Sequence, residues 1–325
     1  MIITRTPLRV SFAGGGTDLP QFYRNYGGGA VASAAIDKYV HVLVNTKFDR
    51  AIRVAYSKVE NVDRFEEVQH GLFRESMRLT GVTEQLEIHS IADIPGEGTG
   101  LGSSSTLTVG LLNALYAYKG QVKDPSTLAE EAAHIEIDVL GGTLGKQDHY
   151  AAAFGGVHYF EFRPDDSVKA TPIPLTGRDR DALSDHLSLF YTGVTRQAQG
   201  ILKSQDSRTG ANKDVLLQMR DLAASTRDAL IARDWARLGG ILDEGWRMKQ
   251  ELASGITNEA IDAAYAKAKA AGALGGKIAG AGGGGFLLVV HPPERSHQIE
   301  SALAPMRRLP IRIAPEGSQI LVVRR

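Results

Sequence analysis

Near the start of the chain, apolar and polar residues alternate with the two-residue period that is typical of half-buried β-strands. Ile2–Phe12 reads as an opening strand, and Ala30–Asp37, Tyr39–Phe48 and Ala51–Ser57 continue the pattern. Short separations between such stretches favour antiparallel pairing. The first part of the chain is therefore predicted to be rich in β-structure.

Farther along, apolar residues recur at helical spacing. Glu66–Thr80, Thr106–Tyr118 and Ser126–Val139 are predicted helices, the last with Ser126 as its N-cap. The strand-like run Leu86–Asp93 leads toward the second of them. Strands and helices therefore share the first half of the chain.

A polar, proline-containing connection, PDDSVKATPIPLTGRDRD, interrupts this pattern after the strand-like Gly156–Phe162. Domain boundaries commonly fall in such linkers, so we predict two domains, residues 1–175 and 176–325. Beyond the boundary, the pattern predicts four helices and two closing strands, at Lys213–Ala232, Trp235–Leu252, Asn258–Ala271, Glu294–Met306, Ile311–Ala314 and Gln319–Val323.

Composition narrows the class of protein. The 325 residues are 43% hydrophobic and 23% charged, as in an ordinary globular protein. The formal net charge is zero, so we expect neither nucleic acid nor a membrane as a partner. No stretch approaches the length of a spanning helix, and no basic-then-apolar leader precedes the first strand. Cysteine is absent, which excludes thiol catalysis and suits a cytoplasmic location.

The stretch PGEGTGLGSSST at 95–106 is the strongest chemical signal in the sequence. Its glycines lie between a predicted strand and a predicted helix, where main-chain N–H groups and the helix N-terminus can surround an anion. The spelling differs from both GxxxxGK[ST] and GxGxxG. A flexible linker is the alternative, but flanking regular elements favour a polyphosphate-binding loop.

Two further stretches carry candidate chemistry. GGTLGKQDHYAAAFGG at 141–156 places four polar residues between glycines and alanines, which suggests that they line a cleft. GGKIAGAGGGGFLLVV at 275–290 is a third glycine-rich block between apolar runs. These blocks can act together only if both domains close over one cleft.

These motifs together resemble those of the GHMP kinase superfamily. The loop at 95–106 is similar to its second motif, PxGxGLGSSA, although Ser105 and Thr106 stand where an alanine is usual. The block at 275–290 matches the third motif, KxxGAGxGGxxxxL, and TPLRVSFAGGGTDLP resembles the first in its sugar-1-kinase form. GKQDHYAAAFGG resembles the GKQDQ segment of heptose and fucose kinases. The resemblance implies an α+β fold with an N-terminal mixed-sheet domain, a C-terminal ferredoxin-like domain and an active site between them.

The resemblance also implies roles for individual residues. Asp148 would be the catalytic base and Arg9 would lie near the transferred phosphate. Ser104 and Glu136 would hold Mg²⁺. The ATP phosphates would be bound by Gly98, Gly100, Leu101, Gly102, Ser103, Ser104 and Ser105, and the sugar by Asp18, Gly16, Thr17, Gly283 and Gly284. Purely structural roles remain open at this point: a turn cap for Asp18, a surface strand charge for Arg9, a helix-surface acid for Glu136 and a loop acid for Asp148.

The implied activity is ATP-dependent phosphorylation of the anomeric C1 hydroxyl of D-glycero-D-manno-heptose 7-phosphate, for nucleotide-heptose and surface glycan synthesis. Arg196, Lys203 and Arg24 are candidate donors to the 7-phosphate. Another sugar 1-kinase of the fucokinase type and a non-catalytic sugar and ATP sensor remain alternatives. The expected partner is a small sugar phosphate, and a homodimer is left open.

Overall fold

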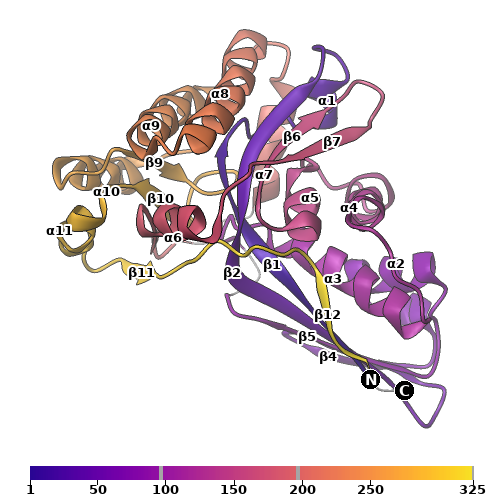
Figure 1. Cartoon of the computed structure of the whole chain (residues 1–325). Coiled ribbons are helices and arrows are strands. Elements are labelled where there is room, and N and C mark those ends of the chain that lie inside the picture. Colours follow the sequence, from indigo (N-terminus) through magenta and orange to yellow (C-terminus); the bar gives the residue numbers. More distant parts are fainter. Residues whose placement is uncertain (95–97, 195–197, 324–325) are drawn as a thin grey trace.

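The computed structural model describes residues 1–94, 98–194 and 198–323. Within these ranges it forms an eight-stranded sheet and a four-stranded sheet. Figure 1 shows the larger sheet with α2 to α5 on one side, and the smaller sheet with α8 to α11 beside its upper part. The predicted two-part α+β architecture is confirmed.

The larger sheet has the order β12-β1-β2-β5-β3-β4, with β6 pairing β2 and β7 pairing β6. Its strands are β1 (Ile2–Ala13), β2 (Gly29–Thr46), β3 (Ile52–Ala55), β4 (Val59–Val62), β5 (Leu86–Ala92), β6 (Val157–Phe162), β7 (Val168–Pro172) and β12 (Gln319–Val323).

Strand β2 replaces two strands that the sequence predicted separately. Its first part pairs with β6 and its second with β5, while β1 runs antiparallel beside both parts. The register against β1 shifts between Pro7 and Leu8, opposite the polar Asp37–Tyr39 stretch that looked like a break. A long strand can change partners without ending, and polarity alone does not reveal this.

Helix α3 (Ser103–Tyr118) packs against β1 and β2 and is buried along most of its length. Gly110 permits this approach, because a Cβ there would lie 2.9 Å from Thr6 Oγ1. The helices around it in the first domain are α1 (Pro20–Tyr23), η1 (Phe65–Glu67), α2 (Gly71–Thr80), α4 (Pro125–Ala133), the π-helix η2 (His134–Val139) and α5 (Gln147–Phe154).

Two predicted helix boundaries were wrong. The helix predicted at 66–80 is broken, because Glu60 accepts hydrogen bonds from the N–H groups of Gln69 and His70 and holds them outside any helix. The helix predicted to begin with a Ser126 cap instead has Asp124 as its N-cap, with Pro125 at the first helical position. It continues beyond Ala133 as the π-helix.

The smaller sheet has the order β11-β8-β10-β9. With its helices it follows the β-α-β-β-α-β sequence of a ferredoxin-like domain. Its elements are α6 (Gly177–Asp185), β8 (Leu187–Tyr191), α7 (Ala198–Ser207), α8 (Lys213–Ala232), α9 (Trp235–Leu252), α10 (Glu259–Ala270), β9 (Gly275–Ile278), β10 (Phe286–Val290), η3 (Pro293–Arg295), α11 (Ser296–Ala302) and β11 (Arg307–Leu309).

The end of the chain differs from the predicted domain layout. The first sheet ends at Pro172, close to the predicted boundary, but β12 pairs with β1 and so returns to the first sheet. The termini therefore lie side by side in Figure 1. The predicted strand at 311–314 makes only an isolated bridge, between Ile313 and Ile36, and β11 completes the second sheet instead.

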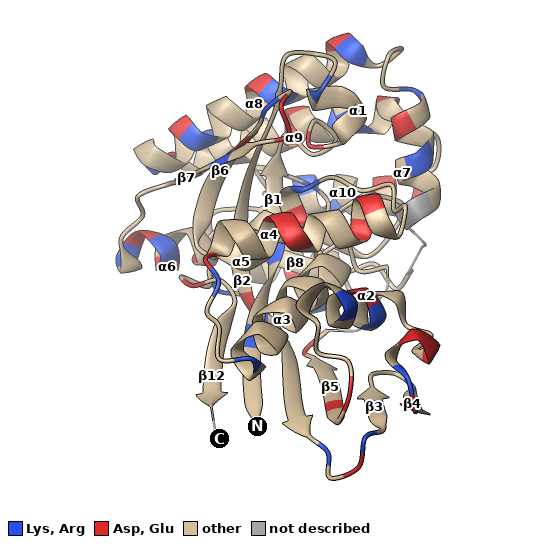
Figure 2. Ribbon diagram, turned by 90° about the vertical axis from the view of Figure 1, so that its right-hand side faces the viewer, with Lys and Arg blue, Asp and Glu red and all other residues tan. Residues whose placement is uncertain are grey.

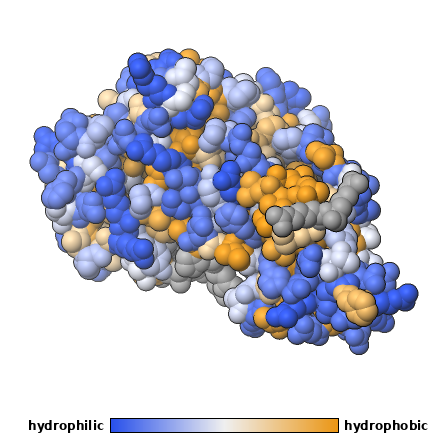
Figure 3. Space-filling model, turned by 60° about the horizontal axis from the view of Figure 1, so that its bottom comes forward, coloured by the Kyte–Doolittle hydropathy of each residue, from blue (hydrophilic) through white to orange (hydrophobic). Residues whose placement is uncertain are grey.

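Surface charges of both signs are interspersed along α6 and α8 (Figure 2). The face seen in Figure 3 shows apolar side chains gathered among polar ones, and Ile91 on β5 and Leu321 and Val323 on β12 are exposed apolar residues of the larger sheet. Within the described ranges, no helix is long and apolar enough to cross a membrane.

Candidate active site

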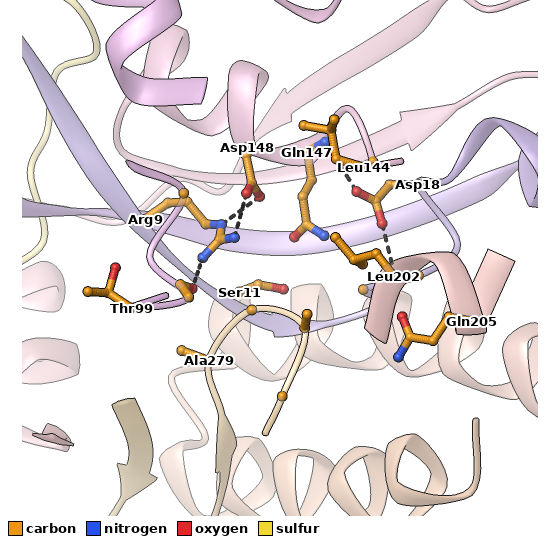
Figure 4. A pocket seen from close by; sticks show the side chains of 18 of the residues that line it. Arg9, Ser11, Asp18, Thr99, Leu144, Gln147, Asp148, Leu202, Gln205 and Ala279 are labelled. Atoms are coloured by element: carbon orange, nitrogen blue, oxygen red, sulfur yellow. Dashed lines mark hydrogen bonds and ion pairs between the residues drawn. The ribbon is translucent and has the colours of Figure 1, made fainter. Parts of the chain in front are cut away.

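A cavity of about 530 Å³ lies where the glycine-rich loops of both domains meet. Its walls come from β1, the turn at 15–19, the loop at 98–104, the segment at 144–148, α7, α9 and the segment at 277–284. Figure 4 shows the side chains that point into it. The three glycine blocks of the sequence therefore converge, as predicted.

The loop after β5 contributes mostly backbone to the cavity. Gly98, Gly100 and Gly102 line it with positive φ angles of 71°, 74° and 82°. At Gly100 a Cβ would lie 2.3 Å from the carbonyl oxygen of Ala279, so only glycine lets the two domains approach this closely. Ser103 and Ser104 also line the cavity and begin α3. The loop thus presents a helix N-terminus and glycine backbone to a ligand, as an anion site requires.

Two members of the predicted phosphate-binding set face elsewhere. Leu101 is fully buried in the core, and its carbonyl accepts a hydrogen bond from the Arg9 N–H at 3.0 Å. Ser105 is also fully buried and does not line the cavity. Both residues shape the loop from behind. Pro95, Gly96 and Glu97 lie outside the described residues.

Arg9 and Asp148 form a bidentate ion pair across the cavity wall. Arg9 Nε lies 2.7 Å from Asp148 Oδ1 and Nη2 lies 2.6 Å from Oδ2, as the dashed lines in Figure 4 show. Arg9 Nη1 also donates to the carbonyl of Gly100. A Cβ placed on Gly102 would lie 3.4 Å from Asp148 Oδ2. The carboxylate therefore faces the glycine loop, and Arg9, only 4% exposed, is not a surface strand charge.

Asp18 lies at the other end of the cavity and is 2% exposed. Its Oδ1 accepts from the Gly16 N–H at 2.9 Å and its Oδ2 from the Gln147 N–H at 3.3 Å. Burial, with the charge of Asp148 as a second cause, raises the pKa of this carboxyl above its usual value. Gly145 must lack a side chain, since a Cβ there would lie 1.8 Å from Asp18 Oδ2. Asp18 is thus held rigidly within the cavity wall.

Three buried polar side chains around this end have an atom without a hydrogen-bond partner within the described ranges. They are Ser11 (Oγ), Gln147 (Oε1) and Gln205 (Nε2), and all three line the cavity. Buried polar atoms are almost always hydrogen-bonded in native proteins. These atoms therefore indicate a ligand rich in hydrogen-bonding groups. Sequence reasoning missed them, because an isolated serine or glutamine carries no spacing signal.

Of the other residues predicted to bind the sugar, two line the cavity and two make backbone contacts outside it. Gly16 and Gly284 line the cavity. Thr17 is fully buried, and its hydroxyl donates to the carbonyls of Gly14 and Ala30 instead. The Gly283 N–H donates to the carbonyl of Ile256 at 2.7 Å, and Gly283 is not among the lining residues. Thr17 and Gly283 hold the two loops in place.

Glu136 lies behind the start of α3. Its Oε1 accepts from Thr108 Oγ1 at 2.8 Å and lies 3.2 Å from His149 Nε2. Thr108 also donates to the carbonyl of Ser104, so Glu136 is one helical turn from the predicted partner serine. It is 6% exposed, which differs from a helix-surface acid, but it does not line the cavity. No cluster of three or more acidic or histidine residues suited to a metal occurs in the part of the chain that the structure describes.

Two charged cavity residues also come from outside the predicted set. Lys249 on α9 and Lys277 on β9 both reach the cavity and are 5% and 6% exposed. Lys277 belongs to the third glycine motif, whose signature includes a lysine, but Lys249 carries no sequence signal. Only the packing of α9 beneath β9 places them together.

This arrangement defines a class of protein: a two-domain enzyme with a backbone cradle for phosphate facing an anchored carboxylate, as small-molecule kinases require. Models of the GHMP kinases N terminal domain and the GHMP kinases C terminal domain match residues 65–156 and 226–306. The chain belongs to the GHMP kinase family. The family, fold and kinase class predicted from the sequence are thereby confirmed.

Named relatives support the same assignment. The chain is 30% identical over 319 residues to a D-glycero-alpha-D-manno-heptose 7-phosphate kinase from Campylobacter jejuni, covering 93% of each chain. It is 28% identical to an L-fucokinase/L-fucose-1-P guanylyltransferase from Bacteroides fragilis, over 92% of this chain and 35% of that protein. A solved D-glycero-D-manno-heptose 1-phosphate kinase from Bacteroides thetaiotaomicron superimposes with a TM-score of 0.83 at 25% identity, covering 100% of both chains.

Proposed function

We propose that the protein transfers the γ-phosphate of ATP to the anomeric C1 hydroxyl of D-glycero-D-manno-heptose 7-phosphate, giving the 1,7-bisphosphate. The observation that carries this proposal is the cavity in which Asp148 faces the glycine loop, with polar side chains beside it that have unpartnered atoms within the described ranges. The choice of a heptose as the acceptor rests on the heptose kinases among the relatives. Such a product suits nucleotide-activated heptose and surface glycan synthesis in the cytoplasm, where ATP is available.

The transfer forms a bond from the C1 oxygen to the γ-phosphorus and breaks the bond to the β–γ bridging oxygen, so that ADP leaves. The proton of the C1 hydroxyl passes to Asp148. An anomeric hydroxyl is more acidic than an ordinary alcohol, so a carboxylate is a sufficient base. Arg9 orients this carboxylate through two hydrogen bonds and places a positive charge beside the reacting groups. Most of the catalysis in such transfers comes from positioning and charge stabilisation.

The acceptor sugar is proposed to bind at the end of the cavity opposite the glycine loop. Asp18 and the free atoms of Ser11, Gln147 and Gln205 offer acceptors and a donor to sugar hydroxyls. Because these groups are buried, an acceptor that leaves them unpaired is rejected strongly. They are proposed to decide which hydroxyl faces Asp148.

The donor site fits a nucleotide with Mg²⁺. Ser104 lines the cavity at the N-terminus of α3, and Glu136 lies one helical turn behind it. These are hard oxygen donors of the kind that Mg²⁺ accepts, with phosphate oxygens and water completing its shell. When bound, the ion would screen the phosphate charges. Ser104 is the better-placed ligand, since Oε1 of Glu136 is already engaged.

Of the three candidate donors to the 7-phosphate, the two that the structure describes, Arg24 and Lys203, do not line the cavity. Arg24 pairs with Asp166, with Arg24 Nε 2.8 Å from Asp166 Oδ1, and does not line the cavity. Lys203 is exposed on α7, whose lining residues are Leu202 and Gln205. Arg196 lies outside the described residues.

A coupled ADP-release assay with a panel of acceptors tests the proposal. We expect the highest kcat/KM with heptose 7-phosphate, and lower values with unphosphorylated heptose, heptose 1-phosphate and L-fucose. Equal or faster turnover of L-fucose would contradict the heptose assignment and favour the fucokinase alternative, which the Bacteroides fragilis relative keeps open. ATP binding without transfer to any sugar would favour the sensor alternative.

A further inference from the structure

Lys249 and Lys277 are the starting point for a further inference. Both line the cavity, and they are only 5% and 6% exposed. Lysine is almost never buried to this degree unless its charge is paired. Neither side chain has a carboxylate within 4.0 Å anywhere in the described ranges; Lys249 Nζ donates to the carbonyl of Gly280 and Lys277 Nζ to that of Phe12 at 3.5 Å. Two ammonium groups therefore face the cavity with only carbonyl partners.

The charges around the cavity do not balance. Its charged lining residues in the described part of the chain are Arg9, Lys249, Lys277, Asp18 and Asp148, three cations against two anions. Arg9 and Asp148 neutralise each other directly. Two lysines then remain against Asp18, so a bound anion would be stabilised here.

The position of Lys249 relates this charge to the glycine loop. Its carbonyl partner belongs to Gly280, and a Cβ on Gly280 would lie 2.6 Å from Gly100 Cα. Burial lowers the pKa of Lys249 to about 8, with the Arg9 charge acting in the same direction and Asp18 and Asp148 opposing it. Burial also lowers the pKa of Lys277 well below its usual value, reinforced by Lys249 and Arg9. The charges of Arg9 and Asp148 therefore both act on the ammonium group of Lys249.

We propose that Lys249 and Lys277 bind the transferred phosphoryl group, first as the γ-phosphate of ATP and then as the new phosphate on the sugar. This role rests on the proposed kinase function and adds two catalytic residues to it. A phosphoryl group between the glycine loop and Asp148 would place its oxygens beside these ammonium groups. Two fixed cations there would stabilise the charge that builds up on the oxygens during transfer.

The 7-phosphate of the acceptor has the same chemistry and is the competing source of the anion. The contact of Lys249 with the Gly280 loop, which abuts Gly100, favours the transferred group. Nucleotide binding without any sugar separates the two sources. It also separates this proposal from the proposed function, since no acceptor has to be known.

The variants are Lys249→Met and Lys277→Met, with Lys249→Arg to keep the charge and Lys267→Met as a control, since Lys267 is exposed on α10. Calorimetry gives Kd for ADP and for a non-hydrolysable ATP analogue, both with Mg²⁺. We expect the Met variants to weaken analogue binding about 10- to 100-fold, the size of a lost charge-assisted hydrogen bond, and to leave ADP binding unchanged. Lys249→Arg should recover most of the loss.

Equal weakening of ADP and analogue binding would overturn the proposal in favour of a purely structural contact to Gly280. Unchanged analogue binding, with a raised KM for heptose 7-phosphate but not for unphosphorylated heptose, would overturn it in favour of the acceptor phosphate. Thermal unfolding of each variant shows whether it is folded. If a Met variant is not folded, the comparison of analogue and ADP binding is made with Lys249→Arg.

Proton uptake provides a second readout. An anion beside Lys249 stabilises its charged form, so analogue binding at pH 8 should take up protons from the buffer. Calorimetry in two buffers of different ionisation enthalpy measures this uptake. We expect more uptake with the analogue than with ADP, and a smaller difference in Lys249→Met. The same uptake with both nucleotides would count against the proposal.

Discussion

The two carboxylates of the cavity, Asp148 and Asp18, are held in opposite ways. Asp148 is 20% exposed and is paired with Arg9 through two hydrogen bonds. Asp18 is almost fully buried, accepts hydrogen bonds from the N–H groups of Gly16 and Gln147, and lacks a cation within ion-pair distance in the described chain. The charge of Asp148 is therefore already paired before any ligand binds.

The charge of Asp18, in contrast, has no paired cation among the described residues before a ligand binds. Near it lie the unpartnered atoms of Ser11, Gln147 and Gln205, and the pKa of Asp18 is raised. Burying polar groups without partners costs stability, so a ligand that supplies those partners gains affinity. In the proposed mechanism, the Asp148 end serves the reaction and the Asp18 end serves recognition of the acceptor. Substitutions at the two ends should therefore have different kinetic signatures.

The largest expected effect is at the reacting end. Asp148→Asn removes the proposed base while keeping its shape, and kcat should fall by about 10²- to 10⁴-fold, the usual contribution of general base catalysis. Steady-state kinetics with saturating ATP and acceptor measures this. Asp166→Asn is the matched control, because it breaks the exposed pair with Arg24, and it should keep wild-type kcat. An Asp148→Asn enzyme with unchanged kcat would remove the base assignment.

An intermediate effect is expected at the recognition end. Gly145→Ala would force Asp18 to move, because the new methyl group would lie 1.8 Å from its Oδ2. We expect KM for the acceptor to rise by about 10-fold or more while the Kd for ADP stays the same, since loss of a hydrogen bond to a charged group costs about 1.5–3 kcal/mol. Gly240→Ala in α9 is the control, with no atom within 4 Å of the added methyl group. A raised ADP Kd in Gly145→Ala would mean that the two ends are not separable.

The smallest expected effect concerns stability and pH. Because the pKa of Asp18 is higher in the folded than in the unfolded chain, the folded chain holds this proton more tightly. The carboxyl therefore destabilises the fold increasingly as pH rises from its unfolded pKa, about 3.9, through the folded value. The Tm of Asp18→Asn relative to wild type should rise by about 1–3 °C between pH 4 and pH 7.

Asp221→Asn, whose side chain is 75% exposed, serves as the control for this series and should show no such trend. Differential scanning calorimetry across the pH range measures both. A Tm difference for Asp18→Asn that shrinks as pH rises would contradict the inferred environment of Asp18.

Local pattern was sufficient to predict much of this architecture. The strands β1 and β5, the helices α8 and α9 and the meeting of three glycine blocks all follow from periodicity and backbone chemistry. The return of β12 to β1 could not be predicted, because strand pairing between residues 314 or more apart leaves no local trace. The cap of α4 was missed because Asp124 and Ser126 are both good capping residues, and only the fold selects between them.

The site shows the same limit. Glycines and the GKQD stretch mark Asp148 and the phosphate loop, whereas Lys249 depends on how α9 packs against β9. Glu136 was expected to hold the metal with Ser104; its Oε1 lies beside Thr108 and His149 and it does not line the cavity, so its metal role stays a prediction. The direction in which a buried side chain points is set by tertiary packing, which sequence motifs do not encode.

Structural analysis of the product tests the central claim most directly. Wild-type protein is incubated with ATP, Mg²⁺ and D-glycero-D-manno-heptose 7-phosphate, and ¹H–³¹P correlation NMR locates the new phosphate. The account predicts a second phosphate coupled to the anomeric proton, formed by the wild type and nearly absent with Asp148→Asn. A new phosphate at any other carbon, or ATP consumption without a sugar bisphosphate, would contradict it.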